Sequence, residues 1–186
     1  MDAVSTAFGL SGAAGLNAWI PLFATGLLDR TGAIEVAAPY DKLGSTWVLI
    51  ALAVLMVADI VGDKVPVIDS VLHAAGTVVH PVAGAILFAG QAGLDDVPSV
   101  VSLASGALIA GSLHATRATA RPVVTGTTAG VGNPVVSLVE DIGSIGLVVL
   151  AVVLPILALL LVVGALAGVV VMFRRVRRGV QARRNE

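Results

Sequence analysis

The chain has no cysteine and few aromatic residues among its 186 residues. Without cysteine it can form no disulfide, thiolate metal site or cysteine nucleophile. Aromatic residues make up only 4%, which leaves little material for stacking nucleic-acid bases. The formal net charge of −1 excludes binding to nucleic acid through bulk electrostatics. We therefore expect no nucleic-acid partner.

Charged residues are also scarce. They make up 12% of the chain, whereas globular domains average roughly 25%. Hydrophobic residues reach 57%, and the mean hydropathy is +0.99. A soluble domain of this size must cover its surface with charge, which this composition does not allow. The sequence therefore predicts an integral membrane protein whose main partner is the lipid bilayer.

The apolar segments predict an all-α, polytopic membrane bundle of about six transmembrane helices, since a span needs roughly 20 apolar residues. A final block of about forty residues would extend roughly 60 Å as one helix. We expect Pro155 to divide it into a fifth and a sixth span, because proline interrupts helices. The alternative is that this whole block forms one kinked helix, which gives five spans. The apolar segments lie at about residues 3–28, 46–61, 71–90, 97–114 and 134–173.

The C-terminal residues 174–186 are rich in arginine. Lysine and arginine concentrate on the cytoplasmic side of membrane proteins. With six spans, the loops that carry Lys64 and Arg117 share the side of this tail. We therefore expect a single membrane domain at residues 1–173, a basic cytoplasmic tail at 174–186, and both termini in the cytoplasm. Such a tail also suits anionic lipid headgroups.

Glycine is abundant, with 21 residues. Small residues at spacings of three to five allow close helix packing, and two pairs are candidate contact faces: Gly106 with Gly111, and Gly164 with Gly168. Such faces would also permit a homo-oligomer or a larger membrane complex.

The first apolar segment contains Gly9, Gly12, Gly15, Asn17 and Pro21. The glycines could form a flat packing face. Alternatively, the helix is broken or re-entrant, which is tolerated where the backbone lines a protein cavity, and the Asn17 amide then faces a ligand.

The fifth segment follows a run of glycine and threonine at residues 125–132, which we expect to form a loop, and this segment could also be broken or re-entrant. Pro134 suits the first turn of a helix, and the exposed N–H groups around Asn133 would attract an anion.

A second polar group surrounds the turn between the second and third segments. Asp59 and Asp63 share one helix face, and Asp69 and His73 repeat the same spacing. These four residues could offer oxygen and nitrogen ligands to a divalent cation, although the spacing is common; no other cofactor is evident. The alternative is a solvated turn in which Lys64 forms an ion pair.

Histidine and arginine line the third and fourth segments. His80 shares a helix face with His73, so it is either a satisfied buried histidine or a proton relay. His114, Arg117 and Arg121 share one face at spacings of three and four. This cationic face suits a phosphate or carboxylate, although arginine here is also typical of a cytoplasmic helix end.

Glu140 and Asp141 lie inside the fifth segment and are the strongest functional signal in the chain, because charge within the membrane is costly. Adjacent helical residues point about 100° apart, so the two acids need separate partners. We expect Glu140 to pair with arginine. We expect Asp141 to be available to a proton, cation or ligand, with Asn17 and His80 among the polar groups in reach.

Three motifs occur together: Gly-Leu-Asn-x-Trp-x-Pro at residues 15–21, Asp-Lys-x-Pro-x-x-Asp-Ser at residues 63–70 followed by His80-Pro81, and Arg117 followed by Asn133, Ser137 and Glu140-Asp141. In combination they resemble the uncharacterised bacterial integral membrane family catalogued as domain of unknown function 4126. The resemblance implies a compact multi-pass protein of a bacterial cytoplasmic (inner) membrane. It implies no established activity.

No HExxH, Walker, GxSxG or CxxC motif is present, so the sequence favours a role other than that of an enzyme. Intramembrane carboxylates and histidines favour a transporter or channel-like carrier for an ion or small solute. The alternatives are an accessory or structural subunit of a membrane complex and a lipid-phosphate-handling protein. The candidate residues for a ligand, ion or proton pathway are Asn17, Asp59, Asp63, Asp69, His73, His80, His114, Arg117, Arg121, Asn133, Glu140 and Asp141.

Overall fold

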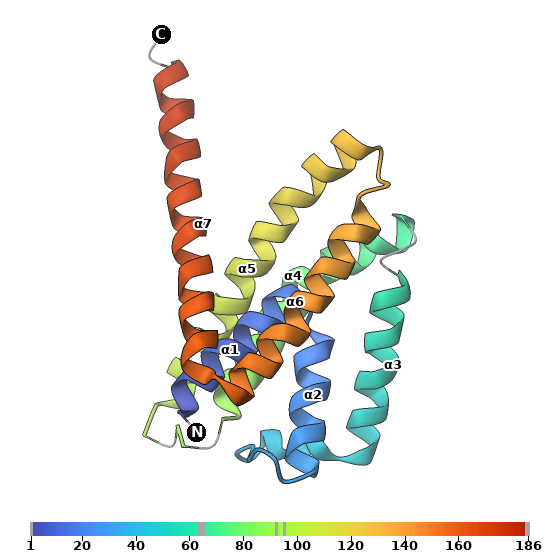
Figure 1. Ribbon diagram of the computed structural model, residues 1–186, viewed down its shortest axis with the longest axis vertical. Coiled ribbons are helices and arrows are strands. Elements are labelled where there is room, and N and C mark those ends of the chain that lie inside the picture. The colour runs from blue at the N-terminus through green and yellow to red at the C-terminus, as the bar shows by residue number, and fades with distance from the viewer. Residues whose placement is uncertain (1, 63–65, 92, 95, 185–186) are drawn as a thin grey trace.

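Helices make up almost all of the computed structural model (Figure 1). The structure describes residues 2–62, 66–91, 93–94 and 96–184. For residues 66, 67, 69, 70 and 176–184 it describes the backbone alone. The described residues contain no named strand, so the all-α prediction is confirmed. The elements are α1 (Ala3–Leu16), α2 (Trp19–Arg30), the short 3-10 helix η1 (Tyr40–Gly44), α3 (Thr46–Gly62), α4 (Pro66–Ala89), α5 (Ser99–Thr128), α6 (Asn133–Val153) and α7 (Pro155–Arg184).

The first apolar segment is broken and re-entrant. Helix α1 ends at Leu16, Asn17 is extended (φ −145°, ψ 128°), and α2 begins at Trp19. Helix α1 runs from one end of the bundle into its interior, and α2 returns to the same end (Figure 1). The start of α1 and the residues after α2 accordingly line one cavity, to which both Ala3 and Gly32 contribute.

The helices α3 to α7 then run alternately up and down the bundle (Figure 1). By length and composition, α4, α5, α6 and α7 can each cross a membrane, and α1 and α3 are shorter apolar helices. Because the α1–α2 pair turns back, α1 begins and α7 ends at opposite ends of the bundle (Figure 1). The expectation of both termini on one side is therefore wrong. That expectation counted residues 3–28 as one complete crossing of the membrane.

The predicted division at Pro155 is confirmed. Leu154 leaves helical geometry (φ −136°, ψ 65°), and α7 begins at Pro155. The fifth segment, in contrast, is not broken: α6 is continuous from Asn133 to Val153. Gly130 and Gly132 fall in the turn before the helix, where Gly130 has a positive φ of 86°, whereas Gly126 belongs to α5. Proline occupies the first turn of α6.

Helix α1 is the centre of the bundle and packs on α4, α5, α6 and α7. Its glycines do form a packing face: a Cβ at Gly9 would lie 2.7 Å from that of Ala151. Helices α4 and α5 meet most closely at Gly84 and Gly106, where a Cβ would collide with the carbonyl oxygen opposite. Gly106 is thus a contact residue as predicted. A Cβ added at Gly164 or Gly168 would have no described neighbour within 4 Å, so these two glycines form no contact face within the described bundle.

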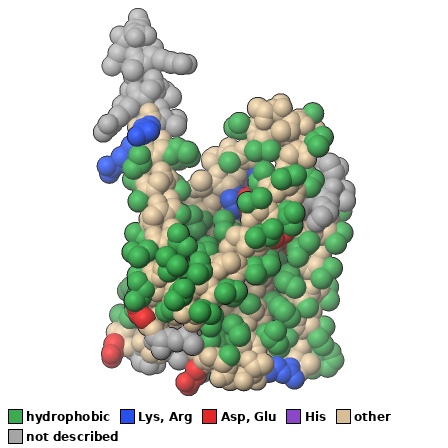
Figure 2. All heavy atoms as spheres, in the orientation of Figure 1, with side chains coloured by type: hydrophobic (Ala, Val, Ile, Leu, Met, Phe, Trp, Pro, Cys, Tyr) green, Lys and Arg blue, Asp and Glu red, His purple; other side chains and the backbone are tan. Residues whose placement is uncertain are grey.

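Apolar side chains cover the flanks of the bundle. Figure 2 shows hydrophobic side chains along the helices, with most charged side chains at the two ends and a few set into a recess between helices. Exposed examples include Val78, Leu108, Val139 and Leu160, each more than half exposed. An apolar belt around polar ends is what a bilayer requires, so the chain is a membrane protein.

Candidate functional site

The break between α1 and α2 places Asn17 between two carboxylates. Its Nδ2 atom donates to Oδ2 of Asp59 on α3 at 3.0 Å and to Oδ1 of Asp141 on α6 at 2.9 Å. Its Oδ1 atom accepts from the backbone N–H groups of Trp19 and Ile20, which caps the first turn of α2. Asn17 and Asp141 are both buried. We call Asn17, Asp59 and Asp141 the Asn17 bridge.

A second charged group lies beside it. Oε2 of Glu140 accepts from Nη2 of Arg117 at 2.5 Å and from Nη2 of Arg121 at 2.8 Å. All three side chains are nearly buried. Nη1 of Arg117 also donates to the carbonyl oxygens of Gly15 and Leu16. Because a helix C-terminus carries partial negative charge, the guanidinium stabilises the end of α1 in the bundle interior. We call Arg117, Arg121 and Glu140 the arginine clamp.

The two adjacent acids of α6 have the separate partners expected from their angular spacing. Glu140 faces the arginines of α5, and Asp141 faces the end of α1. Ser144, one turn beyond Asp141, donates to the carbonyl oxygen of Ala13 at 3.1 Å, so this face of α6 is bound to α1 at successive turns. The predicted pairing of Glu140 with arginine and the contact of Asp141 with Asn17 are confirmed.

Three imidazole rings stack where α4 meets α5. The ring of His114 lies between those of His80 and His73, with centroid distances of 4.1 Å and 5.2 Å. Gly76 makes room for them, since a Cβ there would lie 2.8 Å from Cε1 of His114 and 3.0 Å from Cε1 of His80. Nε2 of His80 is 3.1 Å from Nη1 of Arg117. The histidine stack (His73, His80, His114) therefore joins directly to the arginine clamp.

Not every predicted site residue belongs to this cluster. Asn133 lies at the start of α6, about two turns from Glu140, and accepts a hydrogen bond from Thr125 in the turn. Asp63 and the side chain of Asp69 lie outside the described residues. The residues brought together are Asn17, Asp59, His73, His80, His114, Arg117, Arg121, Glu140 and Asp141.

The divalent-cation site expected from Asp59, Asp63, Asp69 and His73 stays a prediction, because Asp63 and the side chain of Asp69 lie outside the described residues. Among the side chains that the structure describes, no three histidine, aspartate or glutamate residues are grouped to hold a metal ion. The ring of His73 packs against that of His114.

Gly76 and Ser144 were not among the predicted site residues. Gly76 lies three residues after His73 and four before His80, so it shares their helix face, and this spacing is the sequence feature that indicates its contact with the rings. Ser144 carries no comparable signal, because a serine in an apolar helix is ordinary.

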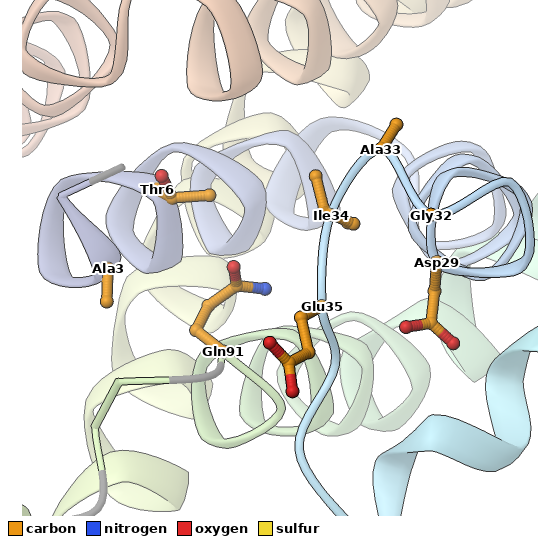
Figure 3. A pocket seen from close by; sticks show the side chains of 8 residues that line it. All are labelled: Ala3, Thr6, Asp29, Gly32, Ala33, Ile34, Glu35 and Gln91. Carbon is orange, nitrogen blue, oxygen red and sulfur yellow. The ribbon is translucent and has the colours of Figure 1, made fainter.

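A cavity of about 600 Å³ opens at the end of the bundle where α1 begins (Figure 3). Asp29 and Glu35 give it an acidic lining. Asp29 is fixed in place because it accepts a hydrogen bond from the backbone N–H of Val36. No local sequence pattern indicates this cavity, because its walls come from three separate segments. They are Ala3, Thr6, Asp29, Gly32, Ala33, Ile34, Glu35 and Gln91.

Comparison with known proteins identifies a family but no activity. One family model matches residues 4–175, nearly the whole chain. No curated protein and no solved structure matches it. The matched range includes all three motifs and every residue of the Asn17 bridge, the arginine clamp and the histidine stack. The chain therefore belongs to the family described as Domain of unknown function (DUF4126).

Proposed function

We propose that this protein is a carrier for a small cation, the proton included, and that the Asn17 bridge is its binding site. The observation that carries the proposal is the amide of Asn17, which holds two carboxylates from different helices at the break of a re-entrant helix. Intramembrane carboxylates are expensive and are usually retained for function. Helices broken inside the bundle form the ion sites of many carriers.

The chemistry of the bridge suits a cation. Carboxylate oxygens bind hard cations and protons, and two of them converge here. The Asn17 amide carries no formal charge, so it positions the carboxylates without itself neutralising them. A cation taken up between Asp59 and Asp141 would draw α3 and α6 onto the hairpin. Binding is thereby linked to the relative position of three separate helices.

The neighbouring groups favour a carrier over a lipid-phosphate-handling protein. Both guanidinium groups of the predicted cationic face already bind Glu140. The acidic cavity at the other end would raise the local concentration of cations.

The basic residues at the end of α7 suit the cytoplasmic side, against anionic lipids. We accordingly place the protein in a bacterial cytoplasmic membrane, with the acidic cavity facing away from the cytoplasm.

The test is cation flux in liposomes that contain the full-length protein. Alkali-cation and proton fluxes are measured for the wild type and for Asp141→Asn, with Asp41→Asn as the control because Asp41 is exposed and outside the cluster. We expect flux in the wild type and in the control, and none in Asp141→Asn. A folded Asp141→Asn protein with wild-type flux would refute the binding site.

A further inference from the structure

The histidine stack contains a buried ring whose polar atoms form no hydrogen bond within the described part of the chain. His114 is 3% exposed, and neither its Nδ1 nor its Nε2 atom has a hydrogen-bond partner among the described residues. Buried polar atoms are nearly always paired, because leaving them unpaired is unfavourable. A buried imidazole left without these partners points to a ligand that the ring takes up during function.

The neighbouring His80 is held in one neutral form. A guanidinium only donates hydrogen bonds, so Nε2 of His80 must be the acceptor in its contact with Arg117. The ring proton is then on Nδ1, which donates to the carbonyl oxygen of Gly76 at 2.9 Å. A second proton on Nε2 would set two donors against each other and break the contact with Arg117.

His114, in contrast, can take up a proton without losing a hydrogen bond. The groups that act on it within the described part of the chain come from three helices. His73 and His80 lie on α4, Arg117 and Arg121 on its own helix α5, and Glu140 on α6. Burial of the ring opposes a charge on it, as do the two arginines, and the carboxylate of Glu140 favours the charge.

We propose that His114 is a proton-binding site and that the proton is the coupling ion of the carrier. The inference rests on the proposed carrier function. A proton from water binds Nδ1 or Nε2 and gives the imidazolium; no other bond forms or breaks. The new charge lies beside Arg117, which holds both Glu140 and the end of α1. Repulsion weakens that hold, so proton binding at His114 is transmitted to the Asn17 bridge.

The chain has three histidines, which makes the proton site directly observable. Full-length protein with ¹⁵N-labelled histidine is reconstituted in lipid, and the ring nitrogen signals are recorded as the pH is lowered from about 8 to about 3, because the charge change of histidine moves with its surroundings. His114→Phe, which keeps an aromatic ring in the stack, assigns the signal; His114→Gln serves if that variant does not fold. We expect His114 to convert to the imidazolium while His80 keeps its neutral Nδ1-protonated form. A His114 signal that stays neutral throughout, or a His80 ring that takes the proton in its place, would overturn the proposal.

Flux separates this inference from the carrier function. In liposomes with an imposed pH gradient and alkali cations present, we expect His114→Phe to lose proton flux and Thr119→Val, an exposed substitution on the same helix, to retain it. Absence of any flux in the wild type would refute the carrier function. Wild-type proton flux in His114→Phe would refute the proton site alone.

Discussion

The side-chain amide of Asn17 donates to the carboxylate of Asp141 at 2.9 Å, which joins the break after α1 to the middle of α6. The same nitrogen donates to Asp59 on α3, and the oxygen of the amide caps α2. One neutral side chain thus ties together the helices that surround the break. Its removal should disturb folding and the proposed binding site together.

Asn17→Ala should lower stability more than the same change at another asparagine. It removes a helix cap and two hydrogen bonds to carboxylates, a combined loss of roughly 2 kcal/mol or more. Asn133→Ala is the matched control, because Asn133 contacts only Thr125 by a side-chain hydrogen bond among the described contacts. Thermal unfolding in detergent measures both. Equal melting temperatures for the two variants would mean that the bridge contributes nothing to stability.

Glu140→Gln should reduce yield and unfolding free energy. The substitution keeps the shape of the side chain but leaves two nearly buried guanidinium groups without their shared carboxylate, and breaking a buried pair this way costs about 3–5 kcal/mol. Arg174→Gln, at an exposed position, is the control and should have little effect.

Coupling within the clamp can be measured with a double-variant cycle. Arg121→Gln combined with Glu140→Gln should lose less stability than the sum of the two single variants, because the second change removes a charge that the first left unpaired. Strictly additive losses would show that the two side chains act independently.

Gly106→Ala should destabilise the bundle, whereas Gly164→Ala should not. A Cβ at Gly106 meets the backbone of Gly84 on α4, which cannot rotate away as a side chain can, so overpacking should cost roughly 1–3 kcal/mol or more. A Cβ at Gly164 meets no described atom within 4 Å. Unfolding in detergent distinguishes the two variants. Equal stability would argue against the close approach of α4 and α5.

The re-entrant course of α1 and α2 predicts that Asp2 and Arg175 lie on opposite sides of the membrane, whereas a full crossing by the first segment would put them on the same side. The chain has no cysteine, so Asp2→Cys and Arg175→Cys each introduce a unique thiol at an exposed position. We expect an impermeant thiol reagent to label Asp2→Cys in intact cells, and Arg175→Cys only after the membrane is permeabilised. Labelling of both from the same side would restore a full crossing by the first segment.

Local features of the sequence were enough to predict a helical membrane protein, the division of the last apolar block at Pro155, and the separate partners of Glu140 and Asp141. Each depends on neighbouring residues: the length of an apolar run, the missing N–H of proline, and the angle between adjacent residues on a helix. The cost of charge in a membrane likewise marked the polar residues that the structure brings together.

The course of the first segment was decided only by tertiary structure. Residues 3–28 are apolar enough to cross a membrane, so composition alone does not distinguish a crossing from a hairpin. The break at Asn17 is stabilised by Asp59, Asp141 and Arg117, which lie 42, 124 and about 100 residues away in the chain. The histidine stack likewise needed α4 and α5 to meet at Gly84 and Gly106 before His114 could lie against His80. Such contacts depend on which helices become neighbours, and no local pattern in the sequence contains that information.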